Sequence, residues 1–460
     1  MRETFVQLSY LVASVLFILG LKGLSRADTA LRGVNYAAFG MLLAIVGTLS
    51  QQQIIDYRWI AVGLVVGTVI GVPLGTRVPM TAMPQRIAIA LTFGATAATL
   101  VGVAEYHDHA DTFTLGQRVA VGFEVVLGSL TVAGSLIAFG KLQEILPSRP
   151  LTYRGQNVAN FVLLGVIVTV LGAVVAQVGG MPLFYTLIGL AFLAGVSLVL
   201  PIGGADMPVV VALLNSYSGL ASAATGFAIS NNVLIVSGAL DGASGFFLSV
   251  LMSKAMNRSF GNVLFGAFGS DSGTAPAVGA GKDLVAVPIT AEDAAVQLAY
   301  ASNVIVVPGY GMAVAQAQHQ VRELAELIER RGGEVRYAIH PVAGRMPGHM
   351  NVLLAEANIP YDKLYDMDEI NGDLARADVA LVIGANDVVN PAARTDPTSP
   401  IYGMPILNVD EAKSVIVLKR GMSVGFAGID NMLFYQPRTR MLFGDAKQSL
   451  IKLVTEIKSL

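Results

Sequence analysis

The feature that most constrains this chain is a series of nine long apolar stretches in its first 255 residues. Each approaches the roughly 20 residues that an α-helix needs to cross a bilayer. They lie at about residues 4–24, 33–50, 58–76, 86–105, 117–139, 158–178, 181–202, 207–229 and 231–252. Hydrophobic residues make up 54% of the 460 positions and charged residues only 13%, which excludes an ordinary soluble enzyme. The sequence therefore predicts a multi-span α-helical membrane bundle of about nine helices.

The positive charges between these stretches predict which way the protein faces. Nine spans place the two ends of this region on opposite sides of the membrane. Ten basic residues fall in loops on the C-terminal side, namely Lys22, Arg26, Arg32, Arg77, Arg86, Lys141, Arg149, Arg154, Lys254 and Arg258, and three on the other, namely Arg2, Arg58 and Arg118. Because Lys and Arg are enriched in cytoplasmic loops, we expect a multi-pass protein of the cell inner (plasma) membrane. Its N-terminus would lie outside and its C-terminal half in the cytoplasm, with which the absence of cysteine agrees.

Several polar side chains fall inside or beside the predicted spans, although polar groups are costly at membrane depth. Glu124 lies in the fifth span, Asn215 in the eighth and Asp241 in the ninth. Asp206 precedes the eighth span in a glycine-containing loop. We expect a proton or ion path past Asp206, Asn215 and Glu124. The alternative is that these groups only form hydrogen bonds between helices.

Beyond the ninth span the chain changes character. Residues 259–288 include the segment GSDSGTAPAVGAGK, whose Gly, Ser, Ala and Pro content predicts a flexible linker. Strand patterns then alternate with helix patterns: VIVV at 304, EVRYAIH at 334, a strand near KLYDM, DVALVIGA at 378, PILNV at 405 and SVIVLKR at 414, with a closing helix from Asp445. This alternation predicts a soluble α/β Rossmann-like domain with a parallel doubly wound sheet. We therefore expect a transmembrane domain at 1–258, a linker at 259–288 and a nucleotide-binding domain at 289–460.

The clearest nucleotide signal is the stretch Val304–Gln318, VIVVPGYGMAVAQAQ. Its β-branched residues end at Pro308, and Gly309-Tyr310-Gly311 leads into a helical pattern that we extend to about Arg331. Backbone N–H groups at such a turn suit a pyrophosphate, and glycines let it approach closely. Because Val314 stands where G-x-G-x-x-G has its third glycine, a plain strand-to-helix turn with glycines at positive φ remains the alternative.

A second polar turn is expected at the same crevice. In a doubly wound sheet the ligand lies where the loops leaving the first and fourth strands diverge. Those loops are Gly309-Tyr310-Gly311 and Gly384-Ala385-Asn386-Asp387. The sequence therefore predicts that the two turns converge.

Basic residues favour NADP over NAD. The strand at 334 ends without the acidic residue that binds a ribose 2′-hydroxyl in NAD sites. Lys419 and Arg420 end a later strand, and such paired cations suit an extra phosphate; a solvated basic pair is the alternative. Arg345, in a Gly/Pro-rich loop, could hold pyrophosphate by a bidentate contact. No nucleophile–base pair or metal cluster stands out, so a cofactor would carry the chemistry.

Six longer motifs extend the interpretation to the whole chain. They are GGADMPVVVALLNSYSG from Gly203, KAMNRSF from Lys254, PGYGMAVAQAQ from Pro308, HPVAGRMPGHMNVLLAEA from His340, GANDVVNPAA from Gly384 and MLFGDAK from Met441. This set resembles the β subunit of the proton-translocating NAD(P) transhydrogenases. The resemblance implies nine membrane helices followed by an NADP(H)-binding domain that holds its nucleotide in the reverse of the usual Rossmann orientation.

The resemblance also implies which residues line NADP(H), in addition to Gly309 and Gly311. They are Tyr310, Val342, Ala343, Gly344, Arg345, Met346, Pro347, Gly384, Ala385, Asn386, Asp387, Val388, Gly403, Met404, Lys419, Arg420, Gly421, Met422, Ser423, Val424, Gly425, Phe426, Asp445 and Ala446. Lys419 and Arg420 would hold the 2′-phosphate. Asn386 and Asp387 are the predicted catalytic residues, with Asp387 beside the nicotinamide, where it would help report the redox state to the membrane.

Three positions depart from the pattern of this family. Gly421 stands where many relatives have a serine, and Phe426 replaces a common tyrosine. Leu91 aligns with the proton-path histidine of many bacterial relatives. No predicted span contains a histidine, since His107 and His109 fall in an acidic outer loop, where solvation explains them. The proton carrier would be Glu124, a water chain or a histidine of another subunit, and we favour the last because an imidazole titrates near pH 7.

The sequence thus predicts an NADP(H)-binding subunit of a Re/Si-specific transhydrogenase, which couples hydride transfer from NADH to NADP+ with inward proton movement. It would need alpha subunit(s) carrying the NAD(H)-binding domain and the remaining membrane helices, and we expect a dimer of the assembled unit in membrane lipid. The net charge of −2 predicts no nucleic-acid partner. The alternative is a transporter or channel with a nucleotide-sensing cytoplasmic domain.

Overall fold

The computed structural model describes residues 2–24, 27–50, 57–77, 82–147, 151–203, 206–255, 260, 285–344, 348–397, 399, 401–425 and 427–460. They fall into two compact units, one of which includes the helical residues up to Val250 and the other the described residues from 285 to 460. The predicted linker at 259–288 lies almost entirely outside the described residues.

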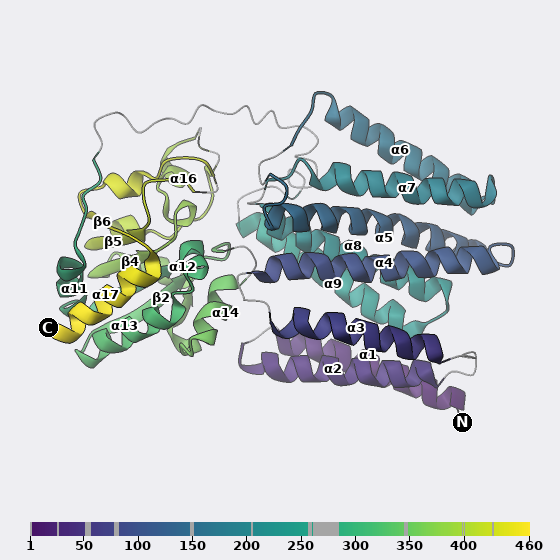
Figure 1. Ribbon diagram of the computed structural model, residues 1–460, viewed down its shortest axis with the longest axis horizontal. Helices are drawn as coiled ribbons and strands as arrows, with labels where there is room; N and C mark the ends of the chain where they lie inside the picture. The colour runs from purple at the N-terminus through teal and green to yellow at the C-terminus, as the bar shows by residue number, and fades with distance from the viewer. Residues whose placement is uncertain are drawn as a thin grey trace. The chain divides into compact units, whose positions relative to one another are not determined.

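The first unit is a bundle of long helices (Figure 1). Within the described residues, nine helices are long and apolar enough to cross a membrane, which confirms the predicted number of spans. They are α1 Arg2–Leu24, α2 Ala27–Leu49, α3 Arg58–Thr76, α4 Met83–His109, α5 Leu115–Leu142, α6 Gln156–Val175, α7 Gly180–Val199, α8 Met207–Ala228 and α9 Asn232–Ala255.

Two of these helices form the interior of the bundle. In the most apolar window of α5, 67% of the residues are buried, and in that of α8, 72%, whereas the corresponding window of α3 has none. α5 packs against α4, α7 and α8. Its first turn is fixed by Thr114 and Gln117: the Thr114 Oγ1 accepts from the Gln117 N–H, and the Gln117 Oε1 accepts from the Thr114 N–H at 3.0 Å. Polar groups on α5 and α8 therefore lie at the centre of the bundle, while α3 presents its side chains to lipid or to another chain.

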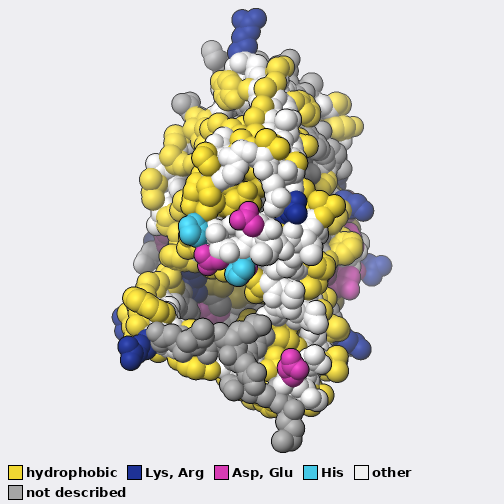
Figure 2. Space-filling model, turned by 90° about the vertical axis from the view of Figure 1, so that its right-hand side faces the viewer, with side chains coloured by type: hydrophobic (Ala, Val, Ile, Leu, Met, Phe, Trp, Pro, Cys, Tyr) yellow, Lys and Arg dark blue, Asp and Glu magenta, His cyan; other side chains and the backbone are white. Residues whose placement is uncertain are grey.

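His107 and His109 occupy a different position from the predicted one. α4 continues to His109, so His107 and His109 lie in the last helical turn and not in a loop. Both are exposed, and each lies beside a carboxylate: His107 is 3.0 Å from Asp108, and His109 is 3.2 Å from Glu105. Figure 2 shows histidine and acidic side chains close together on a face that is otherwise largely hydrophobic.

A seam of glycines joins α8 to α9. A Cβ atom added to Gly219 would lie 2.3 Å from the backbone nitrogen of Gly242, and one added to Gly238 would lie 2.4 Å from that of Ala223. The Ser216 hydroxyl also donates to the Gly242 carbonyl at 2.7 Å. Small residues allow such close helix contact in a membrane, where no hydrophobic force drives helices together. The two backbones are therefore in direct contact along this seam.

The second unit is built on a six-stranded parallel sheet in the order β3-β2-β1-β4-β5-β6. Its strands are β1 Asn303–Pro308, β2 Glu334–Ile339, β3 Leu364–Asp366, β4 Val379–Ile383, β5 Ser414–Lys419 and β6 Thr439–Phe443. Its helices are α11 Ala291–Ala299, α12 Tyr310–Ala315, α13 Gln318–Arg330, α14 His349–Glu356, α15 Met367–Leu374, α16 Ala392–Thr395 and α17 Ala446–Ser459. This arrangement confirms the predicted doubly wound α/β fold.

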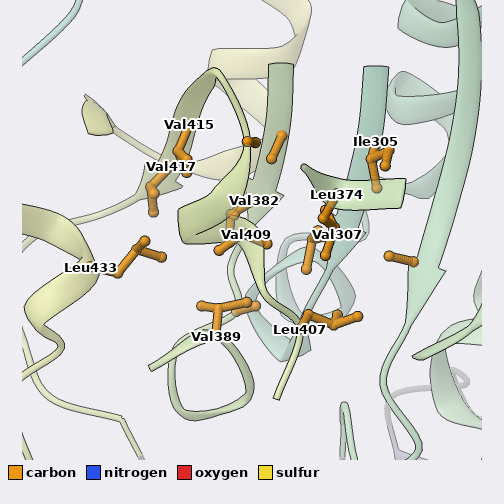
Figure 3. Packing of buried hydrophobic residues seen from close by; sticks show 14 of the residues in the cluster. Ile305, Val307, Leu374, Val382, Val389, Leu407, Val409, Val415, Val417 and Leu433 are labelled. Carbon is orange, nitrogen blue, oxygen red and sulfur yellow. The ribbon is translucent and has the colours of Figure 1, made fainter. Parts of the chain in front are cut away.

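The central strands β1, β4 and β5 are buried at consecutive positions, as expected for a parallel sheet that is covered on both sides. On one side α11 and α13 pack against α17. On the other, alternate strand residues join α15 and irregular segments in one buried cluster. Figure 3 shows Val382 of β4, Val409 and Leu433 within this cluster.

Two details of the predicted second unit are wrong. The segment PILNV, predicted as a strand at 405, is an irregular chain that leads into a 3-10 turn at Val409–Glu411, and β6 takes the edge of the sheet. Pro405 has no N–H to donate to a sheet. Leu407 and Val409 are buried although they do not belong to a strand. The helix predicted up to about Arg331 is also divided, because Gln316 adopts φ 48° and ends α12.

Candidate functional site

The turns that follow β1 and β4 meet at the carboxyl edge of the sheet. The Gly309 N–H donates to the Ile383 carbonyl and the Gly311 N–H to the Gly384 carbonyl, both at 2.9 Å. A Cβ atom on Gly309 would lie 2.4 Å from the backbone of Ala385. Because β1 and β4 are the central strands of this order, the turns converge at its switch point, where doubly wound folds bind their ligands.

The glycines of this junction are needed for close approach. Gly309 has φ −130° and ψ −176°, an extended conformation that any residue adopts, and Gly311 does not have positive φ either. Only Gly384, across the junction, is left-handed, with φ +63°. The first turn therefore lacks the positive φ that the plain-turn alternative assigned to its glycines. Its Gly309 and Gly311 N–H groups bond within the protein, so a pyrophosphate here would have to rely on other donors.

The turn after β4 is contacted by Gly425 and by residues 427–431, which we call the covering segment. The Ala427 N–H donates to the Asp387 carboxylate at 3.0 Å, and a Cβ on Gly425 would lie 2.4 Å from the same carboxylate. The buried Asn431 donates its amide to both the backbone and the side-chain oxygen of Asn386, at 3.0 and 3.1 Å. The two predicted catalytic residues are therefore fixed by one neighbouring segment.

A third contact fastens the same segment. Asn390 is fully buried, and its side-chain amide donates to the Asp430 carbonyl at 3.1 Å. Its side-chain oxygen accepts from the Ala392 N–H at 3.1 Å. Sequence reasoning assigned no role to Asn390, although it lies in the motif GANDVVNPAA, or to Asn431, since each pairs with a residue 40 or more positions away.

The predicted cation pair is engaged by two different partners. Lys419, at the end of β5, donates to the Ser423 carbonyl and lies 5.8 Å from the ring of Phe434. Partial burial lowers the pKa of Lys419, while the nearby Asp387 carboxylate opposes that shift. Arg420 lies 3.7 Å from Asp445, whose carboxylate caps α17 by accepting from the N–H of Lys447 at 3.1 Å. Lys419 is thus more than a solvated surface charge, and its ammonium group is near the predicted catalytic carboxylate.

The loop after β2 is organised by a buried histidine. His340 is 1% exposed, its Nδ1 accepts from the Val342 N–H at 3.2 Å, and its Nε2 lies 2.8 Å from the Pro405 carbonyl. Burial lowers the pKa of His340 to about 4, so the ring is neutral at pH 7 and Nε2 donates to that carbonyl. Gly344, with φ +108°, leaves room for the ring of His349. Arg345, Met346 and Pro347, like Phe426, lie outside the described residues.

Gly403 and Met404 border an open cavity of about 500 Å³ at the α15 side of the sheet. Gly403 has φ +77° and its N–H donates to the Ala393 carbonyl at 2.7 Å. Arg394, which also lines the cavity, pairs with Asp410 at 2.5 Å. In the part of the chain that the structure describes, no group of three or more His, Cys, Asp and Glu residues could hold a metal ion.

In the membrane unit, the three residues predicted for a proton path do not form one cluster. The Asn215 amide donates to Asp241 of α9 at 3.0 Å, while the fully buried Glu124 accepts from the Thr225 hydroxyl at 2.7 Å. Thr225 is ten residues beyond Asn215 in α8, which is roughly 15 Å along the helix axis. Asp206 immediately precedes α8. The bundle therefore contains two separate carboxylates at different depths, each hydrogen-bonded to a neutral side chain of α8.

Comparison with known proteins identifies the family. The family model described as NAD(P) transhydrogenase beta subunit matches residues 6–456. Two sequences from Rhodospirillum rubrum, each described as NAD(P) transhydrogenase subunit beta, are 49% identical to this chain over 461 aligned residues and cover 99% of both chains. The chain belongs to the NAD(P) transhydrogenase beta subunit family. Membership makes it part of a transhydrogenase and implies an alpha subunit as its partner.

Two of the positions that depart from the family pattern, Gly421 and Leu91, lie among the described residues. Gly421 has open space around it: no described atom lies within 4 Å of a Cβ added there. Leu91 packs against an apolar cluster that includes Ala88, Val210 and Leu214, so this position of α4 offers no proton-carrying group.

Proposed function

We propose that this transhydrogenase subunit binds NADP(H) at the carboxyl edge of its sheet and transfers hydride from NADH to NADP+ together with an alpha subunit. The observation that carries this proposal is the junction at Gly309 and Gly384. The Asp387 carboxylate, which follows β4 at this junction, attracts the charge of Lys419. The junction is the switch point of the sheet, where doubly wound folds bind dinucleotides, and the cations at 419 and 420 suit the 2′-phosphate that distinguishes NADP from NAD.

The residues of the chain act by holding and orienting the nucleotide. NADP(H), when bound, supplies the nicotinamide that accepts or releases the hydride. Asp387 fixes the covering segment through the Ala427 N–H, and Asn431 fixes Asn386 beside it. Because the Asp387 carboxylate attracts the Lys419 charge and accepts from the Ala427 N–H, a change in the charge of the nicotinamide would act on this carboxylate and be passed to the covering segment.

The remaining parts of the proposal concern the assembly. The enzyme is Re/Si-specific and works as a dimer of the assembled unit, in which an alpha subunit contributes the NAD(H)-binding domain and further membrane helices. Residues 1–258 form the membrane domain and 289–460 the NADP(H) domain, joined by a linker at 259–288. The membrane is the cell inner membrane, with the N-terminus outside and the NADP(H) domain in the cytoplasm. Protons move inward past Asn215 and Asp206.

Calorimetric titration of the purified subunit with NADPH and NADH tests the binding site. Removing both cations by Lys419→Ala and Arg420→Ala should weaken NADPH binding at least about tenfold, since a hydrogen bond to a charged group contributes about 1.5–3 kcal/mol. NADH binding should change little. The matched control is Lys413→Ala, which removes an exposed cation just before the opposite end of β5, where it pairs with Asp378 at 2.8 Å. Unchanged discrimination between the two nucleotides in the double variant would refute the site.

A further inference from the structure

A second carboxylate at membrane depth has no place in the path proposed above. Asp241 is nine residues beyond the start of α9, which continues for a further fourteen residues to Ala255. Its Oδ1 accepts a hydrogen bond from the Nδ2 of Asn215 at 3.0 Å. We propose that Asp241 is the group of this chain that carries the proton, and that Asn215 is the residue that positions it. This inference rests on the proposed function, because it names the carrier of the same proton path.

The backbones of α8 and α9, which carry Asn215 and Asp241, are held at a fixed separation. Asn215 precedes Ser216, whose hydroxyl donates to the carbonyl of Gly242, the residue after Asp241. A Cβ on Gly245 would lie 2.8 Å from the Ser216 backbone nitrogen and 3.1 Å from the Asn215 amide. The glycine seam therefore fixes the distance between the two side chains, and a catalytic or transport group benefits from such a fixed second residue.

The chemistry of the two side chains assigns their roles. An amide cannot change charge near neutral pH, whereas a carboxylate can bind and release a proton. The Asn215 bond uses Oδ1, so the proton binds at Oδ2. The step is proton binding alone: the carboxylate takes a proton from water to become the neutral acid, and it returns the proton to water on the other side. No electron or other group is transferred.

Glu124 is the competing carboxylate, and its surroundings differ. It is completely buried between α4, α5 and α8, where its Oε1 accepts from the Thr225 hydroxyl and a Cβ on Gly102 would lie 3.2 Å from its carboxyl carbon. Asp241 is exposed on the surface of this chain. Inside a bilayer an exposed carboxylate is stable only against water or against polar groups of another protein helix. Its open side is therefore where a proton can enter and leave.

The buried lysine at the end of α5 does not replace Asp241. Lys141 of α5 is buried and donates to the carbonyls of Leu200 and Ile202. Within the described residues, the side chain recorded in a polar contact with Asp241 is Asn215 alone. With Leu91 in an apolar cluster, Asp241 is the exposed titratable group nearest to the amide that the proton path is proposed to pass.

The test uses the complex of this chain with its alpha subunit in lipid vesicles, with proton uptake followed by a pH-sensitive dye. Asp241→Asn keeps the shape of the side chain but cannot carry a proton, and we expect uptake to fall at least about tenfold. Asp241→Glu should restore much of it. The matched control is Ser237→Ala, one turn earlier in α9, where the hydroxyl donates to the Leu234 carbonyl of its own helix; its uptake should equal that of the wild type.

Two further measurements separate this inference from the proposed function. NADPH binding by the Asp241→Asn complex should be unchanged, which shows that the protein is folded. Infrared difference spectra should contain a protonated-carboxyl band that disappears in Asp241→Asn. Normal proton uptake by Asp241→Asn, with loss in Glu124→Gln or in a variant of a partner histidine, would overturn the assignment. If the wild-type complex transferred hydride without any proton uptake, the proposed function itself would fail.

Discussion

Two glycine junctions place the polar groups of this protein, one between β1 and β4 and the other between α8 and α9. At both, backbone atoms would lie within 2.5 Å of an added Cβ. An amide and a carboxylate lie beside each junction: Asn386 and Asp387 in the sheet, Asn215 and Asp241 in the bundle. They differ in how the polar groups are bonded. In the sheet unit, backbone N–H groups and a buried amide hold both side chains, whereas in the bundle one side chain holds the other.

This difference corresponds to different tasks. A nucleotide site needs donors and acceptors held in place by many bonds, because the bound molecule must be oriented for hydride transfer. A proton path needs a carboxylate with one oxygen available to water. Close backbone contact thus supports a fixed site in one unit and a group that changes its protonation state in the other.

The largest effect on stability is expected from a substitution that breaks the sheet junction. Gly309→Ala places a Cβ 2.4 Å from the Ala385 backbone, between two turns that are hydrogen-bonded to each other and cannot separate. We expect a loss of about 3 kcal/mol or more in the free energy of unfolding. The control is Gly372→Ala in α15, where no described atom lies within 4 Å of the added Cβ and helix propensity favours alanine. A thermal unfolding midpoint in Gly309→Ala equal to that of the control would contradict the role of the junction.

A smaller effect is expected at the bundle junction. Gly219→Ala places a Cβ 2.3 Å from the backbone nitrogen of Gly242, but two membrane helices can separate slightly, so we expect a cost of about 1–2 kcal/mol. The separation should lengthen the bond between Asn215 and Asp241 and reduce proton uptake. Gly172→Ala in α6, with no described atom within 4 Å, serves as the control. Full uptake by Gly219→Ala would show that the spacing of α8 and α9 does not set the path.

The smallest effect concerns pH and involves the sheet unit. Because burial lowers the pKa of His340 to about 4 from an ordinary value of 6.5, the unfolded chain binds more protons between these values. The stabilisation is complete above pH 6.5 and decreases as the pH falls toward 4. At pH 5.5 the expected loss is about 1.4 kcal/mol.

Denaturant unfolding at pH 7.5 and 5.5 measures this loss. His340→Gln should remove the part of the pH dependence that belongs to this ring, whereas His319→Gln, at an exposed position of α13, should leave it intact. An identical pH dependence in both variants would exclude His340 as its source.

The sequence was sufficient to predict the elements that have a clear hydrophobic pattern or a long apolar run. Nine spans followed from apolar runs near 20 residues, and the parallel sheet followed from runs such as Val304–Val307. It was not sufficient for short elements: PILNV is apolar but follows Pro405, while TRMLF, which forms β6, has Arg440 near its middle. A five-residue run does not show whether its burial comes from a sheet or from an irregular chain.

The pairing of side chains was harder to predict than the elements. Asn215 and Asp241 are both evident as polar residues within spans, but their contact depends on how α8 and α9 rotate against each other, which the glycines at 219, 238 and 242 determine. Distance from the connecting turn did not reveal the pair either: Asn215 precedes Asn231 by sixteen residues and Asp241 follows it by ten, a difference of about 9 Å along the helices. Asn431 gave no signal of its pairing, because it lies in an irregular segment.

The central claim is that this chain supplies the NADP(H) site and part of the proton path, while the NAD(H) site belongs to the alpha subunit. The most direct measurement follows the reverse reaction, hydride transfer from NADPH to an NAD+ analogue, together with proton uptake, in vesicles that contain this chain with and without the alpha subunit. We predict that the chain alone catalyses no transfer, and that adding the alpha subunit restores transfer and proton uptake together. Sustained transfer by the chain alone, or restored transfer without proton movement, would contradict it.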